Sequence, residues 1–226
     1  MIKPYYETEN GKLYHGDCLE ILPQLTEKID LVLTDPPYGV GQARGTIGVA
    51  RAHKITYLTD CDTPDFVKNI CIQVINKCLS FSKAIILTPG PKMFTFYPQP
   101  DSFGCFYQPA SVGLQHWGRA DSQPIFYYGR NPRVGKTITA TSFVLTERAS
   151  CDEHPCSKPL QAWVKLLLIG SLDNDLVLDP FLGSGTTAVA CEKLGRRWIG
   201  IEISEEYCKI AVKRIERERS QMKLCL

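Results

Sequence analysis

Residues 175–195 read DLVLDPFLGSGTTAVACEKLG, and they carry the strongest indication of the fold. Its first residues form a short apolar run, which is typical of a strand buried on both faces of a parallel sheet. The turn Gly183-Ser184-Gly185 follows, and its missing Cβ atoms let the backbone approach a ligand closely. The next ten residues predict a helix over 186–195 that ends with Gly195 in the C′ position.

The same alternation of strand and helix continues along the rest of the chain. We predict further strands at 12–17, 29–35, 83–90, 123–130 and 196–202, and helices at 18–25, 63–81, 157–172 and 205–221. This pattern indicates an α/β fold, with a mostly parallel twisted sheet and helices on both faces. No repeat or boundary divides the 226 residues, so we expect a single domain over 1–226 with a flexible loop at 40–60.

Composition narrows the class of protein without identifying a partner. The formal net charge is +2, so any nucleic-acid surface must be a local patch. No apolar run is long enough for a membrane span and the N-terminal residues lack a signal-peptide core, so a cytoplasmic location and no membrane partner are expected. Among the ten cysteines, the nearest approach to a metal cluster is formed by Cys151, His154 and Cys156. Three candidate ligands fall short of a tetrahedral zinc site, and we expect no metal.

An acidic residue follows the glycine turn at a distance that suggests a nucleoside ligand. Glu202 lies nineteen positions after Gly183 (202 minus 183), where dinucleotide folds bind ribose hydroxyls. The third glycine of G-x-G-x-x-G is absent, because position 188 is Ala188, and no Gly-Lys-Ser/Thr phosphate loop exists. A nucleoside without a pyrophosphate therefore fits better than a dinucleotide.

These residues resemble the S-adenosylmethionine-dependent amino-methyltransferases that act on DNA. The resemblance rests on DPFLGSGTT, on IGIE with the helix EEYCKIAVKRI, and on HPCSKPLQAWVKLLL at 154–168, and it covers nearly the whole chain. It implies a Rossmann-like methyltransferase fold with S-adenosyl-L-methionine as cofactor. It places Lys158 and Pro159 near the methionine portion of that cofactor. The other implied cofactor contacts are Asp179, Pro180, Phe181, Gly183, Ser184, Gly185, Thr186, Thr187 and Glu202.

The tetrapeptide Asp35-Pro36-Pro37-Tyr38 is the catalytic motif that this resemblance implies. Its two prolines fix φ and remove N–H donors, so the chain is stiff where it leaves the predicted strand. An exocyclic amine is a poor nucleophile because its lone pair is delocalised into the base. Acceptors from Asp35 and the Pro36 carbonyl would hold its two hydrogens and restore the lone pair, while Tyr38 stacks on a flipped-out base.

The order of the motifs is the reverse of the usual one. Asp35 precedes Asp179 by 144 positions (179 minus 35), which resembles the circularly rearranged group called the beta class. That group implies that the strand before Asp35 lies beside the glycine-loop strand. It also implies that Asp17 neighbours the cofactor adenine and binds its amino group. A helix N-cap before CLEIL explains Asp17 equally well, and the two roles are compatible.

Double-stranded DNA is the expected partner, and its contacts are the least specified part of the hypothesis. A short target-recognition region is expected within 91–153, which favours a short recognition site or help from a second subunit in a homodimer. Basic residues of loop 40–60 would contact phosphates, although a solvated lid explains them equally well. The candidate DNA contacts are Arg44, Arg51, His53 and Lys54 in that loop, and Arg119, Arg130, Arg133 and Lys136 beyond it.

Several functions compete with adenine methylation at N6. Methylation of cytosine N4 keeps the chemistry, and the resemblance favours adenine because Asp-Pro-Pro-Tyr is commoner in the adenine group. Methylation of RNA or of a protein amide uses related motifs, but usually with the glycine loop first. A non-catalytic DNA-binding subunit should lack Asp35, Tyr38 or the glycine turn, and all three are present.

Overall fold

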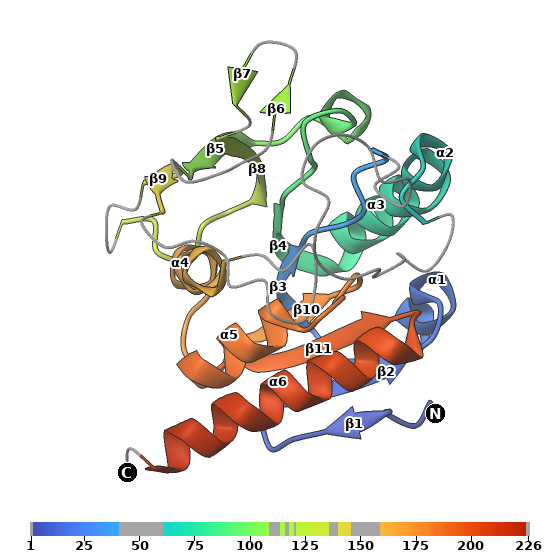
Figure 1. Ribbon diagram of the computed structural model, residues 1–226, viewed down its shortest axis with the longest axis vertical. Helices are drawn as coiled ribbons and strands as arrows, with labels where there is room; N and C mark the ends of the chain where they lie inside the picture. The colour runs from blue at the N-terminus through green and yellow to red at the C-terminus, as the bar shows by residue number, and fades with distance from the viewer. Residues whose placement is uncertain are drawn as a thin grey trace.

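The computed structural model describes residues 2–40, 61–108, 114–115, 118–119, 121–135, 140–145 and 159–224. A nine-stranded sheet forms the middle of this part of the chain, with the order β1-β2-β11-β10-β3-β4-β8-β5-β9 (Figure 1). Its strands are β1 (Tyr6–Glu7), β2 (Gly11–His15), β3 (Ile29–Thr34), β4 (Ser82–Leu87), β5 (Ser102–Tyr107), β8 (Ser122–Gly129), β9 (Phe143–Val144), β10 (Leu176–Asp179) and β11 (Arg197–Glu202). A separate hairpin pairs β6 (Leu114–Gln115) with β7 (Gly118–Arg119).

The centre of the large sheet is parallel and its outer parts are mixed. Strands β2, β11, β10, β3 and β4 all run in the same direction. Strand β8 is antiparallel to β4 and to β5, β9 is parallel to β5, and β1 is antiparallel to β2. The fold class predicted from the sequence, a mostly parallel α/β sheet, is therefore confirmed.

Helices cover both faces of the sheet (Figure 1). One face packs against α4 (Leu160–Gly170), α5 (Thr186–Leu194) and α6 (Glu205–Leu224), the other against α1 (Cys18–Ile21) and against α2 (Pro64–Phe66) with α3 (Ile72–Phe81). Side chains of the central strands alternate between the two cores: Leu31 and Leu33 face the first, and Val32 faces the second. Burial on both faces explains why these strands read as continuous apolar runs.

The helix boundaries differ from the predictions where local chemistry intervenes. The helix predicted at 18–25 is α only over α1 and continues as a 3-10 turn, Leu22–Gln24, because Pro23 has no N–H to donate. The helix predicted at 63–81 begins as expected, since the Thr63 hydroxyl accepts from the N–H of Phe66 at 3.1 Å. Between α2 and α3 it contains a π-helical segment, Val67–Cys71, which the sequence pattern did not indicate. Gly195 closes α5 with a φ of 62°, as predicted.

Strand β5 was not predicted, and its glycine explains why. SFGCFY interrupts a strand pattern with Gly104, which reads as a loop residue. A Cβ on Gly104 would lie 1.9 Å from the Thr141 carbonyl oxygen, so glycine permits another segment to pass against the strand. Strands β1 and β9 were also missed, because each has only two residues.

The crossover connections proceed in opposite directions across the sheet on either side of the β10–β3 pair. From β10 it crosses through α5 to β11 on one side, and from β3 it crosses through α2 and α3 to β4 on the other. Strands β10 and β3 are parallel neighbours, with Leu178 opposite Val32. Their carboxyl ends therefore meet at a topological switch point, where open α/β sheets bind ligands. Within the described residues, no helix is long and apolar enough to cross a membrane.

Candidate active site at the carboxyl edge of the sheet

The two motifs found in the sequence meet at this switch point. Asp35 directly follows β3, and Asp179 ends β10. The Thr34 hydroxyl donates a hydrogen bond to Asp179 Oδ1 at 2.7 Å, which joins the two strand ends directly. At the next strand pair, the N–H of Gly16 donates to the carbonyl of Glu202 at 2.9 Å. All of these groups therefore open onto the same edge of the sheet.

The Asp35 carboxylate is held by hydroxyl groups from two elements. Asp35 Oδ1 accepts from the Tyr38 hydroxyl at 2.5 Å and also from the hydroxyl of Thr88, which follows β4. Gln123, on β8, donates from Nε2 to the Tyr38 oxygen at 2.6 Å. Thr88 is buried, whereas Asp35 and Tyr38 are half-buried. The carboxylate thus has a defined position although solvent or a ligand reaches it.

The backbone of the Asp35–Tyr38 motif is fixed by Asp62, which comes shortly after residues 41–60 in the sequence. Asp62 Oδ1 accepts from the backbone N–H groups of Tyr38 at 3.0 Å and Gly39 at 2.8 Å. Gly90, with a φ of 71°, lies so close to the Tyr38 ring that a Cβ there would be 2.5 Å from it. Sequence reasoning missed Thr88, Gly90, Asp62 and Gln123. Of these, only Thr88 and Gly90 could have been suspected from the sequence, because the tripeptide TPG at 88–90 follows a buried strand as DPPY does.

The turn at 183–185 has a backbone conformation that depends on its two glycines. Gly183 and Gly185 have φ values of 55° and 84°, in the left-handed region that favours glycine. A Cβ on Gly185 would lie 2.8 Å from the Ala211 Cβ, so α6 packs closely beneath the turn. A Cβ on Gly183 would meet nothing nearer than the Phe181 carbonyl oxygen at 4.0 Å. Space therefore remains beside Gly183, as a bound ligand requires.

Glu202 ends β11 beside this turn, and Asp17 follows β2, the strand that pairs with β11. Glu202 is buried, and its two carboxylate oxygens accept from the N–H groups of Gly183 at 2.7 Å and Ser204 at 2.8 Å. Burial raises the pKa of Glu202, and these backbone hydrogen bonds oppose the rise. Asp17 Oδ1 accepts from the N–H of Leu19 at 2.8 Å, which confirms the predicted N-cap of α1.

Asp179 and Thr187 form a buried network, which differs from the direct cofactor contacts expected of them. Asp179 is 3% exposed and accepts from the Thr187 hydroxyl at 2.5 Å and the Phe181 N–H at 3.0 Å, besides Thr34. Trp163 Nε1 donates to the Thr187 oxygen at 2.9 Å. Trp163 lies one turn after Pro159, the N-cap of α4, so the starts of α4 and α5 are neighbours. These side chains therefore fix the end of β10 and the start of α5, on either side of the glycine turn.

The pKa of Asp179 makes a prediction about stability. Burial raises it to about 6, although hydrogen bonds from Thr187, Thr34 and Phe181 oppose the rise. The folded protein then retains a proton that the unfolded chain loses near pH 4, so the free energy of unfolding should decrease as pH rises from about 4 to 6. The decrease amounts to at most about 3 kcal/mol.

Urea denaturation at pH 4 and pH 7 checks this prediction. The Asp179→Asn variant does not ionise at this position, so its stability should decrease less than that of the wild type over the same interval. Comparing the two slopes removes the contribution of the other titrating groups. Parallel pH profiles for the two proteins would show that Asp179 ionises in the folded state as it does in the unfolded chain.

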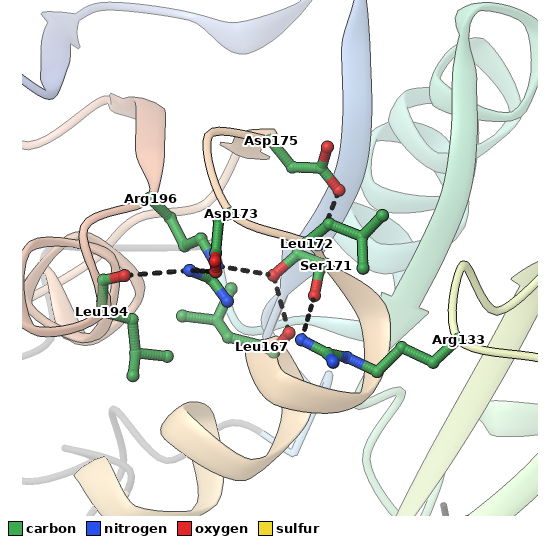
Figure 2. Close-up of polar contacts among 8 residues, drawn as sticks. All are labelled: Arg133, Leu167, Ser171, Leu172, Asp173, Asp175, Leu194 and Arg196. Carbon is green, nitrogen blue, oxygen red and sulfur yellow. Dashed lines mark hydrogen bonds and ion pairs between the residues drawn. The ribbon is translucent and has the colours of Figure 1, made fainter. Parts of the chain in front are cut away.

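Two of the predicted DNA contacts lie at the opposite edge of the sheet. Gly129, at the end of β8, pairs with Ala84 at the beginning of β4, so Arg130 and Arg133 follow at the amino end of the parallel strands. Figure 2 shows Arg133 pointing toward the segment between α4 and β10, where its Nη2 donates to the Ser171 carbonyl at 3.2 Å. The structure does not bring these arginines to the Asp35–Tyr38 motif.

The other contacts drawn in Figure 2 stabilise the same segment between α4 and β10. Arg196 is buried and donates from Nη1 to Asp173 at 2.5 Å and to the Leu194 carbonyl at 3.0 Å. Leu172 donates its N–H to Asp175 at 2.8 Å. This group of residues is a structural connection between α4, β10 and the end of α5.

Other predicted residues fall outside the described part of the chain. These are Arg44, Arg51, His53, Lys54, Lys136 and Lys158, and of Arg119 only the backbone, in β7, is described. The three candidate metal ligands at 151–156 lie outside it as well. Among the residues that the structure does describe, no group of three or more His, Cys, Asp or Glu side chains is arranged to hold a metal ion.

The fold is that of Rossmann-like methyltransferases, and comparison with known proteins shows which family the chain resembles. Residues 117–213 match the family model described as DNA methylase, of the N6/N4 type. A Type II methyltransferase of Lactococcus lactis subsp. cremoris, M2.LlaDCHI, is 27% identical over 96% of this chain and 93% of its own length. The DNA adenine methyltransferase YhdJ of Escherichia coli (strain K12) is 25% identical, over 93% of this chain and 84% of its own.

Solved structures share the fold at lower identity. The complex of M1.HpyAVI with SAM aligns with a TM-score of 0.67 and 21% identity, covering 91% of this chain and 98% of the other. PvuII DNA methyltransferase (cytosine-N4-specific) aligns with a TM-score of 0.66 and 20% identity, covering 94% and 88%. The family match and the relatives agree with each other: the chain is similar to S-adenosylmethionine-dependent DNA amino-methyltransferases over nearly its whole length.

Proposed function

We propose that this protein transfers a methyl group from S-adenosylmethionine to N6 of an adenine that has been flipped out of double-stranded DNA. The observation that carries the proposal is the junction of β3 and β10. There, the Asp35 carboxylate and the Gly183–Gly185 turn follow adjacent strand ends, which are joined by the bond from Thr34 to Asp179. A hydrogen-bond acceptor for an amine thus lies beside a turn suited to a nucleoside.

Asp35 is suited to activating an amine without forming a covalent intermediate. The hydroxyls of Tyr38 and Thr88 fix the carboxylate, so little reorganisation is needed when a substrate N–H approaches. A hydrogen bond to the carboxylate draws the amino nitrogen out of conjugation and directs its lone pair. The backbone carbonyl of Pro36 would accept the second hydrogen, and the stiff Pro-Pro segment keeps that carbonyl oriented.

The turn at 183–185 would hold the cofactor, together with Asp17, Glu202 and Pro159. The open space beside Gly183 and the left-handed backbone of both glycines fit a ligand that approaches the main chain closely. Glu202 orients the turn through the Gly183 N–H. When bound, S-adenosylmethionine supplies a methyl group already activated by its sulfonium, so the protein needs only to bind, orient and exclude water.

Adenine is proposed over cytosine on the sequence of the motif. Both bases present an exocyclic amine conjugated with a ring, so the Asp35 carboxylate serves either one. The Asp-Pro-Pro-Tyr form favours adenine, and one relative carries an adenine name while one structural neighbour is specific for cytosine N4. The homodimer expected from the short recognition region stays a prediction.

Nucleoside analysis of methylated DNA tests the proposal. Purified protein is incubated with S-adenosylmethionine and mixed-sequence duplex DNA, which is then digested and separated by chromatography with mass detection. We expect N6-methyldeoxyadenosine, and none when the cofactor is omitted. Detection of N4-methyldeoxycytidine instead would show that the methylated base is cytosine and not adenine. Methylation of RNA with unmodified DNA in parallel reactions would overturn the substrate class.

A further inference from the structure

Arg214 connects the C-terminal helix to the glycine turn. It lies on α6 and is half-buried, and from Nη1 it donates to the Ser184 carbonyl at 2.6 Å, to Ser184 Oγ at 2.7 Å and to Thr186 Oγ1 at 3.2 Å. Ser184 and Thr186 are themselves buried. The sequence pattern of α6, with alternating acids and bases, predicts a solvated face for this arginine. The structure instead directs it into the turn.

The bond to the Ser184 carbonyl fixes the peptide between Ser184 and Gly185 from one side. The N–H of the same peptide donates to the Leu182 carbonyl at 3.0 Å, so its other side is fixed as well. The N–H of Gly183 is held by Glu202 at 2.7 Å, and that of Leu182 by the Ile201 carbonyl at 2.9 Å. Of these contacts, only the one from Arg214 comes from outside β10, β11 and the turn itself.

The position of this charge is not explained by helix electrostatics. Arg214 lies beside the N-terminus of α5, where the helix dipole disfavours a cation. The first turn of α5 contains no acidic residue, and Gly185 offers no side-chain cap. The three hydrogen bonds therefore have to outweigh an unfavourable field. Close packing of Ala211 against Gly185, one helical turn earlier on α6, brings the arginine within reach.

We propose that Arg214 is a positioning residue of the cofactor site, which holds the Ser184–Thr186 turn in the conformation that binds S-adenosylmethionine. The proposal rests on the proposed cofactor function of that turn. Without the guanidinium, the peptide between Ser184 and Gly185 is free to rotate, and the turn samples conformations that do not bind. Cofactor affinity should then decrease, whereas the DNA surface and the Asp35 motif should not change.

Calorimetric binding of S-adenosylhomocysteine, the demethylated cofactor, tests this role. We expect Arg214→Met to raise its Kd about 10- to 100-fold, as the loss of charged hydrogen bonds implies. Arg214→Lys keeps a single donor group and should lie between this variant and the wild type. Arg217→Met removes an exposed arginine of the same helix and should bind as the wild type does.

Further measurements separate positioning from the alternatives. At saturating S-adenosylmethionine the kcat of Arg214→Met should return to within about twofold of the wild type, with KM for the cofactor raised. Its DNA affinity and melting temperature should stay near the wild-type values, and a general loss of both would overturn the proposal in favour of a structural role. 5′-Methylthioadenosine, which has no carboxylate, should also bind more weakly; unchanged binding would mean that Arg214 pairs directly with the cofactor carboxylate.

The same titration separates the role of Arg214 from the cofactor function of the turn. If the wild-type protein bound neither compound, the cofactor function itself would be wrong. If the wild type bound them and Arg214→Met bound them equally well, only the role of Arg214 would be rejected.

Discussion

Replacing Asp35 with alanine should lower the kcat of DNA methylation by about 10³-fold or more, because the substrate amine loses the acceptor that holds it. The hydroxyls of Thr88 and Tyr38, which donate to this carboxylate, would turn to solvent or to each other and cannot replace it. Cofactor affinity should change little, since the turn at 183–185 is fixed by Glu202 and Arg214. Transfer of a tritiated methyl group to duplex DNA measures the rate.

Asp35→Asn is the conservative companion of this variant. The amide oxygen still accepts from Thr88 and Tyr38, but it carries no charge, so we expect a smaller decrease of about 10²-fold. Asp65→Ala, which removes an exposed carboxylate from the first turn of α2, serves as the matched control and should keep wild-type activity. Equal incorporation by Asp35→Ala and wild type would refute a catalytic role for Asp35.

The position of the site was predictable because parallel strands present their carboxyl ends at one edge. Once DPPY and the glycine turn were assigned to strand ends, a parallel sheet had to bring them to the same side, and the order of motifs implied that their strands are neighbours. The bond between Thr34 and Asp179 is a consequence of that register. Apolar runs and turns are local features of the sequence, and they were enough to predict the position of the site.

The residues that support the motifs were not predictable in the same way. Gln123 reaches Tyr38 from 85 positions away, and Arg214 reaches Ser184 from 30. Neither residue lies in a pattern of its own, so only the packing of β8 and α6 reveals the contact. Asp179 shows the opposite case, a residue whose predicted role differs from its contacts. Its motif implied a cofactor contact, but its carboxylate is buried and accepts hydrogen bonds from the protein instead.

Glu192 should make a large contribution to the stability of the fold. It lies on α5, is 2% exposed, and accepts from the Thr8 hydroxyl at 2.6 Å, Asn10 Nδ2 at 3.0 Å and Trp198 Nε1 at 2.9 Å. These donors belong to the β1–β2 hairpin and to β11, and Arg219 Nε of α6 lies 3.9 Å from Oε2, so one carboxylate connects α5 with three other parts of the fold. Glu192→Ala leaves these donors without their acceptor and should lower the free energy of unfolding by about 3 to 5 kcal/mol.

Denaturation in urea measures this loss, and two further variants show where it comes from. Glu192→Gln keeps an oxygen for Thr8 and Trp198 but turns an amide toward Asn10, so we expect a decrease of about 1 to 2 kcal/mol. Glu216→Ala, at an exposed position of α6, should change stability by less than about 0.5 kcal/mol. Because Glu192 lies at the end of α5 remote from the glycine turn, the folded fraction of Glu192→Ala should bind S-adenosylhomocysteine with wild-type affinity. A weakened affinity in folded protein would mean that the hairpin and the turn are coupled through α5, and that Glu192 acts on the site as well as on the fold.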